Sequence, residues 1–229
     1  MPATFAKVAP KKEFKQVEQT KNQVLFTDYE MVQAETRWIR NTNTYNPAEN
    51  TVISVFNNYF GGGMGSLVFQ TIRESKALAY STYGFYVFPR KKADKYYMMA
   101  YVGAQADKFV EAVAAMNELL TTMPELPANL DLAKVQLKKE IQTERITQDD
   151  IIYDYIKAKD LGLNEDIRKT IYQNLDNISM KDIRTFHDTY LSKKPYTYVV
   201  LASEEKLSKE ELQKIGEFRK LSLEELFGY

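Results

Sequence analysis

The sequence predicts an α+β fold, in which an antiparallel or mixed β-sheet of about four to six strands carries helices on one face. Alternation of apolar and polar residues, which is typical of strands, occurs near the start, in the middle and near the end of the chain. The helical segments come in runs between these strands, unlike the regular strand–helix alternation of a parallel sheet. No repeat with a period of roughly 20–50 residues is present, which argues against a repeat architecture.

The chain divides into an N-terminal arm, residues 1–22, and a single domain, residues 23–229, that ends in a charged tail. The arm carries five lysines against two glutamates. No interleaved aromatic platform accompanies these charges, so a solvated linker is favoured over a nucleic-acid-binding arm. A chain that opens on a linker is expected to be a piece of a longer protein.

The first predicted elements are a strand and two helices. We expect one strand from about Leu25 to Arg40, because apolar and polar residues alternate there. Pro47 suits the first position of a helix, and apolar residues then recur at helical spacing as far as the glycines 61–63. Ser66 is the expected N-cap of a second helix, which ends near Ser75.

A hairpin and a run of helices follow. The segments 77–89 and 95–105 are rich in aromatic and β-branched residues and flank a charged turn, so they predict two antiparallel strands. Helical patterns with capping residues such as Asp107, Asp149 and Ser179 come next. These helical segments are 107–123, 127–146, 149–163, 164–175 and 179–191. Residues 196–202 predict a last strand before the tail.

Composition excludes several kinds of partner and site. Lysine plus arginine and aspartate plus glutamate both total 31, so bulk charge favours neither nucleic acid nor an anionic membrane. The absence of cysteine excludes disulfides, thiolate metal ligands and cysteine nucleophiles. No apolar run approaches the roughly 18 residues of a membrane span, and the arm lacks the apolar core of a signal peptide. We therefore expect neither a nucleic-acid nor a membrane partner, and localisation stays unknown.

The glycine-rich segment raises the question of a phosphate site. Its sequence, GGGMGS, has no lysine for a Walker-type loop and has Ser66 where a dinucleotide fingerprint requires a third glycine. It also joins two predicted helices and does not follow a strand. We therefore interpret Gly61, Gly62 and Gly63 as a structural turn, where two helices meet at a corner.

The chain alone is not equipped for hydrolysis. A catalytic zinc site needs about three protein ligands, usually with two histidines at helical spacing, and His187 is the single histidine. Serine-type catalysis also needs a histidine base, and no G-x-S-x-G elbow is present. Glu140 and Glu144 share a helix face, but beside Lys138 and Lys139 they indicate a solvated salt-bridge face. We predict no catalytic residue and no bound metal or cofactor in this chain.

Arg73 and Tyr80 are the candidate functional side chains, seven positions apart, at the end of a helix and just inside a strand. Both donate hydrogen bonds, and donors on rigid elements suit a peptide carbonyl or the oxyanion that forms when water attacks it. From the residue types alone a structural interpretation is favoured, in which Arg73 pairs with a carboxylate and Tyr80 packs in the sheet.

The segment YFGGGMGSLVFQTIRESKALAYSTY resembles the glycine-turn segment of the pitrilysin/insulinase-type zinc metallopeptidases, the inverzincins. Their repeated domains carry the pattern G-G-x-x-S/G-x-L-F-x-x-x-R-E-x-x-x-L-A-Y-S. The resemblance spans about 25 positions, and the predicted order of elements fits one such domain, of the mitochondrial-processing-peptidase-like type. This sequence has Ala77 where many members have glycine before Leu-x-Tyr.

The resemblance implies a function for a chain that lacks H-x-x-E-H. It implies the non-catalytic C-terminal domain of an enzyme whose zinc is held by an N-terminal domain or half. This domain would line the substrate chamber, help bind the peptide and stabilise the transition state, and the resemblance assigns Arg73 and Tyr80 to binding the substrate. The C-terminal tail KLSLEELFGY is similar to the ends of long bacterial members, so a bacterial parent is expected. Its compartment stays open between the cytoplasm and the periplasm or cell envelope. Two alternatives stay open: an assembly domain of the same fold with no role in proteolysis, and a stand-alone module that binds peptides at a sheet edge.

Overall fold

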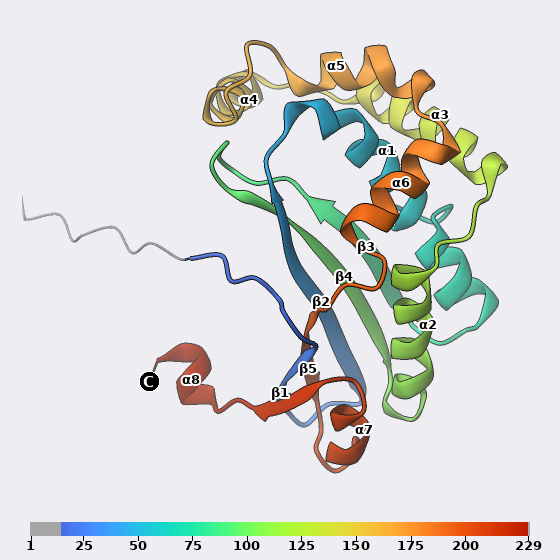
Figure 1. Ribbon diagram of the computed structural model, residues 1–229, viewed down its shortest axis with the longest axis vertical. Coiled ribbons are helices and arrows are strands. Elements are labelled where there is room, and N and C mark those ends of the chain that lie inside the picture. The colour runs from blue at the N-terminus through green and yellow to red at the C-terminus, as the bar shows by residue number, and fades with distance from the viewer. Residues whose placement is uncertain (1–14, 229) are drawn as a thin grey trace, which may run out of the picture.

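The computed structural model describes residues 15–228, which form one mixed sheet with a layer of helices against it. Figure 1 shows α1, α2, α3 and α6 on the same side of the sheet. The predicted α+β class, with helices on one face, is confirmed. Within the described residues the sheet has six strands in the order β3-β4-β2-β5-β1-β6.

The elements alternate irregularly along the chain. The strands are β1 (Gln23–Asp28), β2 (Gln33–Thr44), β3 (Ser81–Val87), β4 (Lys95–Gln105), β5 (Thr197–Ala202) and β6 (Glu217–Lys220). The α-helices are α1 (Asn50–Phe60), α2 (Phe109–Thr121), α3 (Pro127–Thr143), α4 (Gln148–Asp160), α5 (Ile167–Asn174), α6 (Met180–Tyr190), α7 (Lys209–Gln213) and α8 (Leu223–Phe227). The shorter turns are the 3₁₀ helices η1 (Pro47–Glu49), η3 (Ala106–Lys108) and η4 (Leu175–Asn177), and η2 (Phe69–Ser75) is a π-helix.

The sheet is antiparallel on one side and parallel on the other. The β3–β4 hairpin pairs Ser81 with Gly103, and β4 continues antiparallel to β2, as β2 does to β5. Beyond β5, the strand β1 runs parallel to both of its neighbours, β5 and β6. The predicted hairpin and the strand predicted at residues 196–202 are therefore confirmed, but that strand is not the last, because β6 follows it. The strand β4 is paired with a strand on each side.

The core lies between the sheet and the helices. Residues of even number from Ala34 to Trp38 in β2 and from Tyr96 to Val102 in β4 are buried there, whereas the odd-numbered residues between them are more exposed. Trp38 is fully buried, and its indole Nε1 donates to Oδ1 of Asn117 on α2 at 2.8 Å. The Tyr198 hydroxyl donates to the same oxygen at 3.1 Å. This shared acceptor lets two large aromatic residues be buried with their polar atoms satisfied.

The prediction of one strand from Leu25 to Arg40 is wrong. The segment forms two strands, β1 and β2, joined by residues 29–32, and β5 lies between them in the sheet. The even-numbered apolar residues of β1 and β2 keep the same parity across the connection, so the alternation looks continuous in the sequence. Exposed Tyr29 and Val32 mark the break.

The charged tail is folded. It contains α7, the edge strand β6 and α8. Charged residues dominate β6, which is typical of an edge strand but gives no alternating pattern to detect. A pocket of about 440 Å³ lies between α8 and the sheet face opposite the main helical layer. Its lining includes Arg37 and Leu201 from the sheet and Leu223 from α8.

Part of the N-terminal arm is hydrogen-bonded to the sheet. The Gln16 side chain accepts from the Lys95 backbone N–H at 2.7 Å and donates to the Lys95 carbonyl at 3.1 Å. The Asn41 N–H donates to the Gln19 side chain at 2.7 Å. Residues 1–14 of the predicted linker lie outside the described residues.

The helix starts were predicted in part. Pro47 begins η1, as expected, and Ser179 caps α6, with the Asp182 N–H donating to its hydroxyl at 3.3 Å. The caps expected at Asp107 and Asp149 are wrong. Asp107 lies inside η3, and Thr147 caps α4 through a reciprocal pair of bonds with Asp150.

Candidate functional site

The glycine-rich turn joins α1 to η2 and packs against the hairpin. A Cβ atom placed on Gly61 would lie 2.2 Å from the carbonyl oxygen of Gly84 in β3, so the two backbones approach too closely for any side chain at this position. The N–H groups of Gly61 and Gly62 both donate to the Asn57 carbonyl, at 3.1 and 2.7 Å. Gly63 has a φ of 115°, in the region that favours glycine. The turn therefore brings the start of η2 next to β3.

Arg73 lies in the last turn of η2. Ser66 supports the start of this segment, since its hydroxyl donates to the Gly63 carbonyl at 2.7 Å and accepts from the Phe69 N–H at 3.4 Å. At the other end, the Lys76 N–H donates to the Thr71 carbonyl at 3.1 Å, an i+5 bond typical of a π-helix. Segments of this kind often occur at functional sites.

The Arg73 guanidinium is accessible. Its side chain is 48% exposed. The guanidinium carbon lies 4.9 Å from the centre of the Phe69 ring, and Nε lies 3.9 Å from a Glu74 carboxylate oxygen. The ring and the distant carboxylate orient the group without occupying all its donors, because a guanidinium carries five N–H bonds.

The chain then turns sharply into β3. Ala77 has a φ of 50°, in the left-handed region, which is the position where the resemblance expects glycine. The Leu78 N–H donates to the Ile72 carbonyl at 2.9 Å, and the Leu78 side chain is buried. The positive φ and the buried leucine together fix the path from Arg73 to Tyr80.

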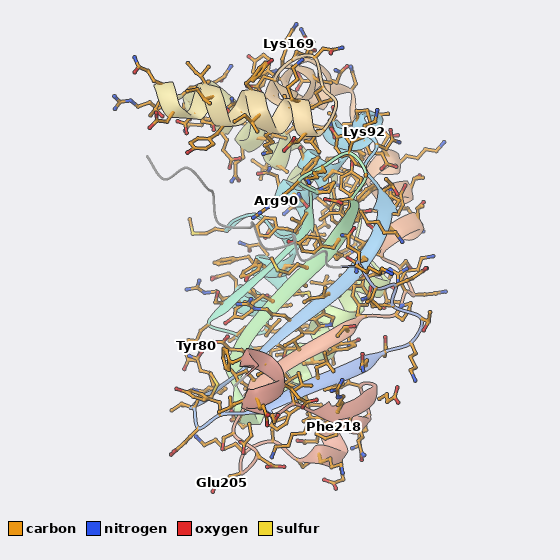
Figure 2. All side chains as sticks on the ribbon, turned by 90° about the vertical axis from the view of Figure 1, so that its left-hand side faces the viewer. Tyr80, Arg90, Lys92, Lys169, Glu205 and Phe218 are labelled. Atoms are coloured by element: carbon orange, nitrogen blue, oxygen red, sulfur yellow. The ribbon has the colours of Figure 1, made fainter. Side chains whose placement is uncertain are left out.

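Tyr80 lies one residue before β3, in a bend, and not inside the strand as predicted. This matters because Thr82 and Gly84, at the same parity in β3, face the core. A regular strand would turn Tyr80 inward, whereas the bend leaves it 56% exposed. Figure 2 shows Tyr80 toward the end of the sheet farther from α4.

A single strand holds both the backbone and the side chain of Tyr80. Its N–H donates to the Gly103 carbonyl at 3.0 Å, and its hydroxyl accepts from Nε2 of Gln105 at 2.8 Å. Within the part of the chain that the structure describes, no hydrogen bond or ion pair joins Arg73 to Tyr80. The two side chains are thus separate donors, each reachable from solvent, on elements that meet at the same turn.

His187 is a core residue. It is 1% exposed, and its Nε2 bonds to the Leu119 carbonyl at 3.0 Å. Burial lowers its pKa below the ordinary value, partly opposed by that carbonyl and by Asp188. Among residues 15–228, no group of three or more histidine, cysteine, aspartate or glutamate side chains is placed to hold a metal ion. The donor set described here therefore does not fit the zinc of the family that the sequence resembles.

The glycine turn, Arg73 and Tyr80 lie within residues 2–137, which match the family model described as "Peptidase M16 inactive domain". The chain belongs to this family. The resemblance read from the glycine-rich segment is thus confirmed, and the M16 inactive domain is a non-catalytic domain of this class of peptidases. None of the curated protein sequences matches the chain.

Several solved structures share the fold of this M16 domain. The crystal structure of the peptidase M16 inactive domain from Pseudomonas fluorescens is 15% identical, with a TM-score of 0.69 over 84% of this chain and 46% of that one. A protease from Helicobacter pylori is 14% identical, with a TM-score of 0.68 over 86% of this chain and 48% of that one. A chain of Complex III2 from Candida albicans is 14% identical, with a TM-score of 0.61 over 88% and 50%. The chain thus spans about half the length of these structures.

The sequence of this M16 domain indicated Arg73 and Tyr80 as candidates, but it did not single out Gln105, the side chain that contacts the Tyr80 hydroxyl. A signal was available. The hairpin register pairs Ser81 with Gly103, so the residues just before Ser81 lie beside those just after Gly103.

Within residues 15–228, no helix combines the length and apolar character needed to cross a membrane.

Proposed function

We propose that this chain is the C-terminal, substrate-binding domain of a zinc metalloendopeptidase, whose zinc is held by another domain or half of the same enzyme. The observation that carries the proposal is the exposure of both Arg73 and Tyr80, which present N–H and O–H donors from elements joined by one short connection. Membership of the family described as "Peptidase M16 inactive domain" supports it, because that description is of a non-catalytic domain of a peptidase.

The two donors have a definite chemical role in this proposal. Peptide cleavage by water builds negative charge on the carbonyl oxygen of the scissile bond, and oriented donors stabilise that charge. The guanidinium of Arg73 supplies a fixed positive charge with several N–H groups, and the Tyr80 phenol supplies one O–H. Arg73 and Tyr80 also orient the peptide, while the bond-breaking chemistry belongs to the zinc-bearing domain.

The test is Tyr80→Phe in the complete enzyme. Loss of one oxyanion donor typically lowers turnover by about 10²–10³-fold, so we expect kcat for a peptide substrate to fall on this scale. Tyr29→Phe is the matched control, since Tyr29 is an exposed tyrosine in the β1–β2 connection. Turnover that is unchanged in Tyr80→Phe would remove the proposed role.

The main alternative is an assembly domain of the same fold, in which Arg73 and Tyr80 are only structural. The fold shared with a chain of Complex III2 favours this alternative, because that chain is part of a multi-subunit complex. The natural sequence upstream of Met1 separates the two proposals. An H-x-x-E-H motif there supports the peptidase, and its absence from every partner chain supports assembly.

A further inference from the structure

We infer that Gln105 is a positioning residue for Tyr80: it donates to the phenol oxygen and so leaves the phenol hydrogen for an acceptor on the bound peptide. This inference deepens the proposed function and rests on it. Its observation is the 2.8 Å bond from Gln105 Nε2 to the Tyr80 hydroxyl.

Gln105 is well placed to fix the phenol. It is the last residue of β4, where it is paired across the sheet with Gln33 of β2. The carbonyl of Gly103, two residues earlier, accepts from the Tyr80 N–H at 3.0 Å. The end of β4 therefore holds Tyr80 at two points, its backbone and its ring oxygen, even though the ring is exposed.

The direction of this hydrogen bond decides what Tyr80 can do. A phenol oxygen accepts through its lone pairs and donates through its single hydrogen. When the partner is an amide N–H, the hydrogen stays available, and donation to the oxygen polarises the O–H bond. When the partner is a carboxylate, the hydrogen is used within the domain and a peptide carbonyl receives nothing. The geometry thus selects ligands that present an acceptor to Tyr80.

Two charged substitutions separate these cases. Gln105→Glu offers only acceptors when ionised, whereas Gln105→Lys offers only donors. In the complete enzyme we expect Gln105→Glu to lower kcat for a peptide substrate by about tenfold or more with KM changed by less than about threefold, as for loss of a transition-state interaction. Gln105→Lys keeps kcat within about threefold, since donation to the phenol is preserved.

The chain offers a matched control pair. Gln142 of α3 donates to the Tyr172 hydroxyl of α5 at 2.7 Å. Like the contact of Gln105, this is an exposed hydrogen bond from a glutamine amide to a tyrosine hydroxyl, but it lies far along the chain from the glycine turn. We expect Gln142→Glu and Gln142→Lys to leave both kcat and KM unchanged. Equal changes in kcat for the Gln105 and Gln142 substitutions would overturn the inference. They would show that a change of surface charge alters turnover without the contact between Gln105 and Tyr80.

The Tyr80→Phe background completes the test. There we expect Gln105→Glu to add less than a twofold further loss, since the group on which it acts is absent. A full loss in that background, or activity kept by Gln105→Glu and lost by Gln105→Lys, contradicts the positioning role. If Tyr80→Phe slows cleavage but neither Gln105 substitution does, the inference alone fails. If Tyr80→Phe itself has no effect, the proposed function fails and the inference with it.

Discussion

Gly61 is the residue on which the geometry of the glycine turn depends most strongly. Gly61→Ala would place its methyl group 2.2 Å from a backbone oxygen of β3, and a strand paired in a sheet has little room to move. We expect a loss of about 2–3 kcal/mol of unfolding free energy, or a displaced turn, as for severe overpacking. The measurement is urea unfolding of the isolated chain.

Gly65, in the same turn, is the control for Gly61. No atom lies within 4 Å of a Cβ placed on it, and its φ is not in the positive region. Gly65→Ala should therefore change the unfolding free energy by less than about 0.5 kcal/mol. Equal losses for the two variants would contradict a steric role specific to Gly61.

Ala77 is expected to be a strained position. Its φ of 50° is unfavourable for a residue with a Cβ by roughly 1–2 kcal/mol, and its side chain is exposed, so its removal loses no packing. Part of the gain is offset, because glycine increases the entropy of the unfolded chain. Ala77→Gly should raise the unfolding free energy by about 0.5–1 kcal/mol, measured by thermal or urea unfolding, whereas Ala77→Val should lower it.

The burial of His187 predicts that the free energy of unfolding depends on pH. Burial lowers the pKa of His187 in the folded state. Above the unfolded pKa of about 6.5 the imidazole is neutral in both states, so the histidine does not reduce the free energy of unfolding. Below that pH the unfolded chain binds the proton first. Unfolding free energy is then lost at about 1.4 kcal/mol per unit, until the pH passes the lowered folded-state pKa.

His187→Gln isolates the contribution of the imidazole. A glutamine amide can still donate to the Leu119 carbonyl but does not titrate in this range. Urea unfolding between pH 7.5 and 5 should show a steeper loss in the wild-type chain than in His187→Gln. Parallel curves for the two proteins would show that the histidine does not contribute to the acid sensitivity.

At the scale of elements, α4 is a long helix with little support from packing. None of its residues is buried, and it lies at the end of the molecule in Figure 1. Arg168 of α5 connects it to its neighbours by ion pairs with Asp154 of α4, Asp166 at the start of α5 and Glu144 at the end of α3, the last at 2.9 Å. The guanidinium also lowers the pKa of Asp166.

Removing Arg168 should therefore loosen α4 selectively. Arg168→Ala leaves three carboxylates without their shared cation, and their mutual repulsion opposes the packing of α4 on α5. We expect faster amide hydrogen exchange across α4, with little change in β2 and β4, because few buried contacts are lost. The control is Arg184→Ala on α6, whose ion pairs with Glu125 and Asp188 are exposed. Faster exchange throughout the sheet in Arg168→Ala would contradict this account.

Elements with a strong local sequence pattern were predicted correctly, and elements with a weak one were missed. The hairpin and the helices of the middle of the chain were predicted because their periodicity is long and their ends carry turn or capping residues. The connection between β1 and β2 was missed because the side-chain parity continues through it, and β6 was missed because four mostly charged residues carry no alternation. The place of β1 in the sheet depends on pairing with β5, and the place of β6 depends on pairing with β1. A local sequence pattern does not encode such long-range pairing.

The candidate site shows the same limit at the scale of the whole molecule. The residue types of Arg73 and Tyr80 suggested donors, but their exposure could not be derived from them. The bend at Tyr80 and the positive φ of Ala77 decide that exposure, and both depend on how η2 packs against β3. The contact with Gln105 also joins two segments 25 positions apart.

The chain contains one tryptophan, and its burial at the junction of sheet and α2 has a practical consequence. Its fluorescence comes from a single enclosed indole, so the emission maximum should shift to longer wavelength as soon as water reaches that junction. An unshifted spectrum in a variant of the surface donors then reports an intact interior, and a change in peptide turnover measured on the same sample can be attributed to the donors themselves.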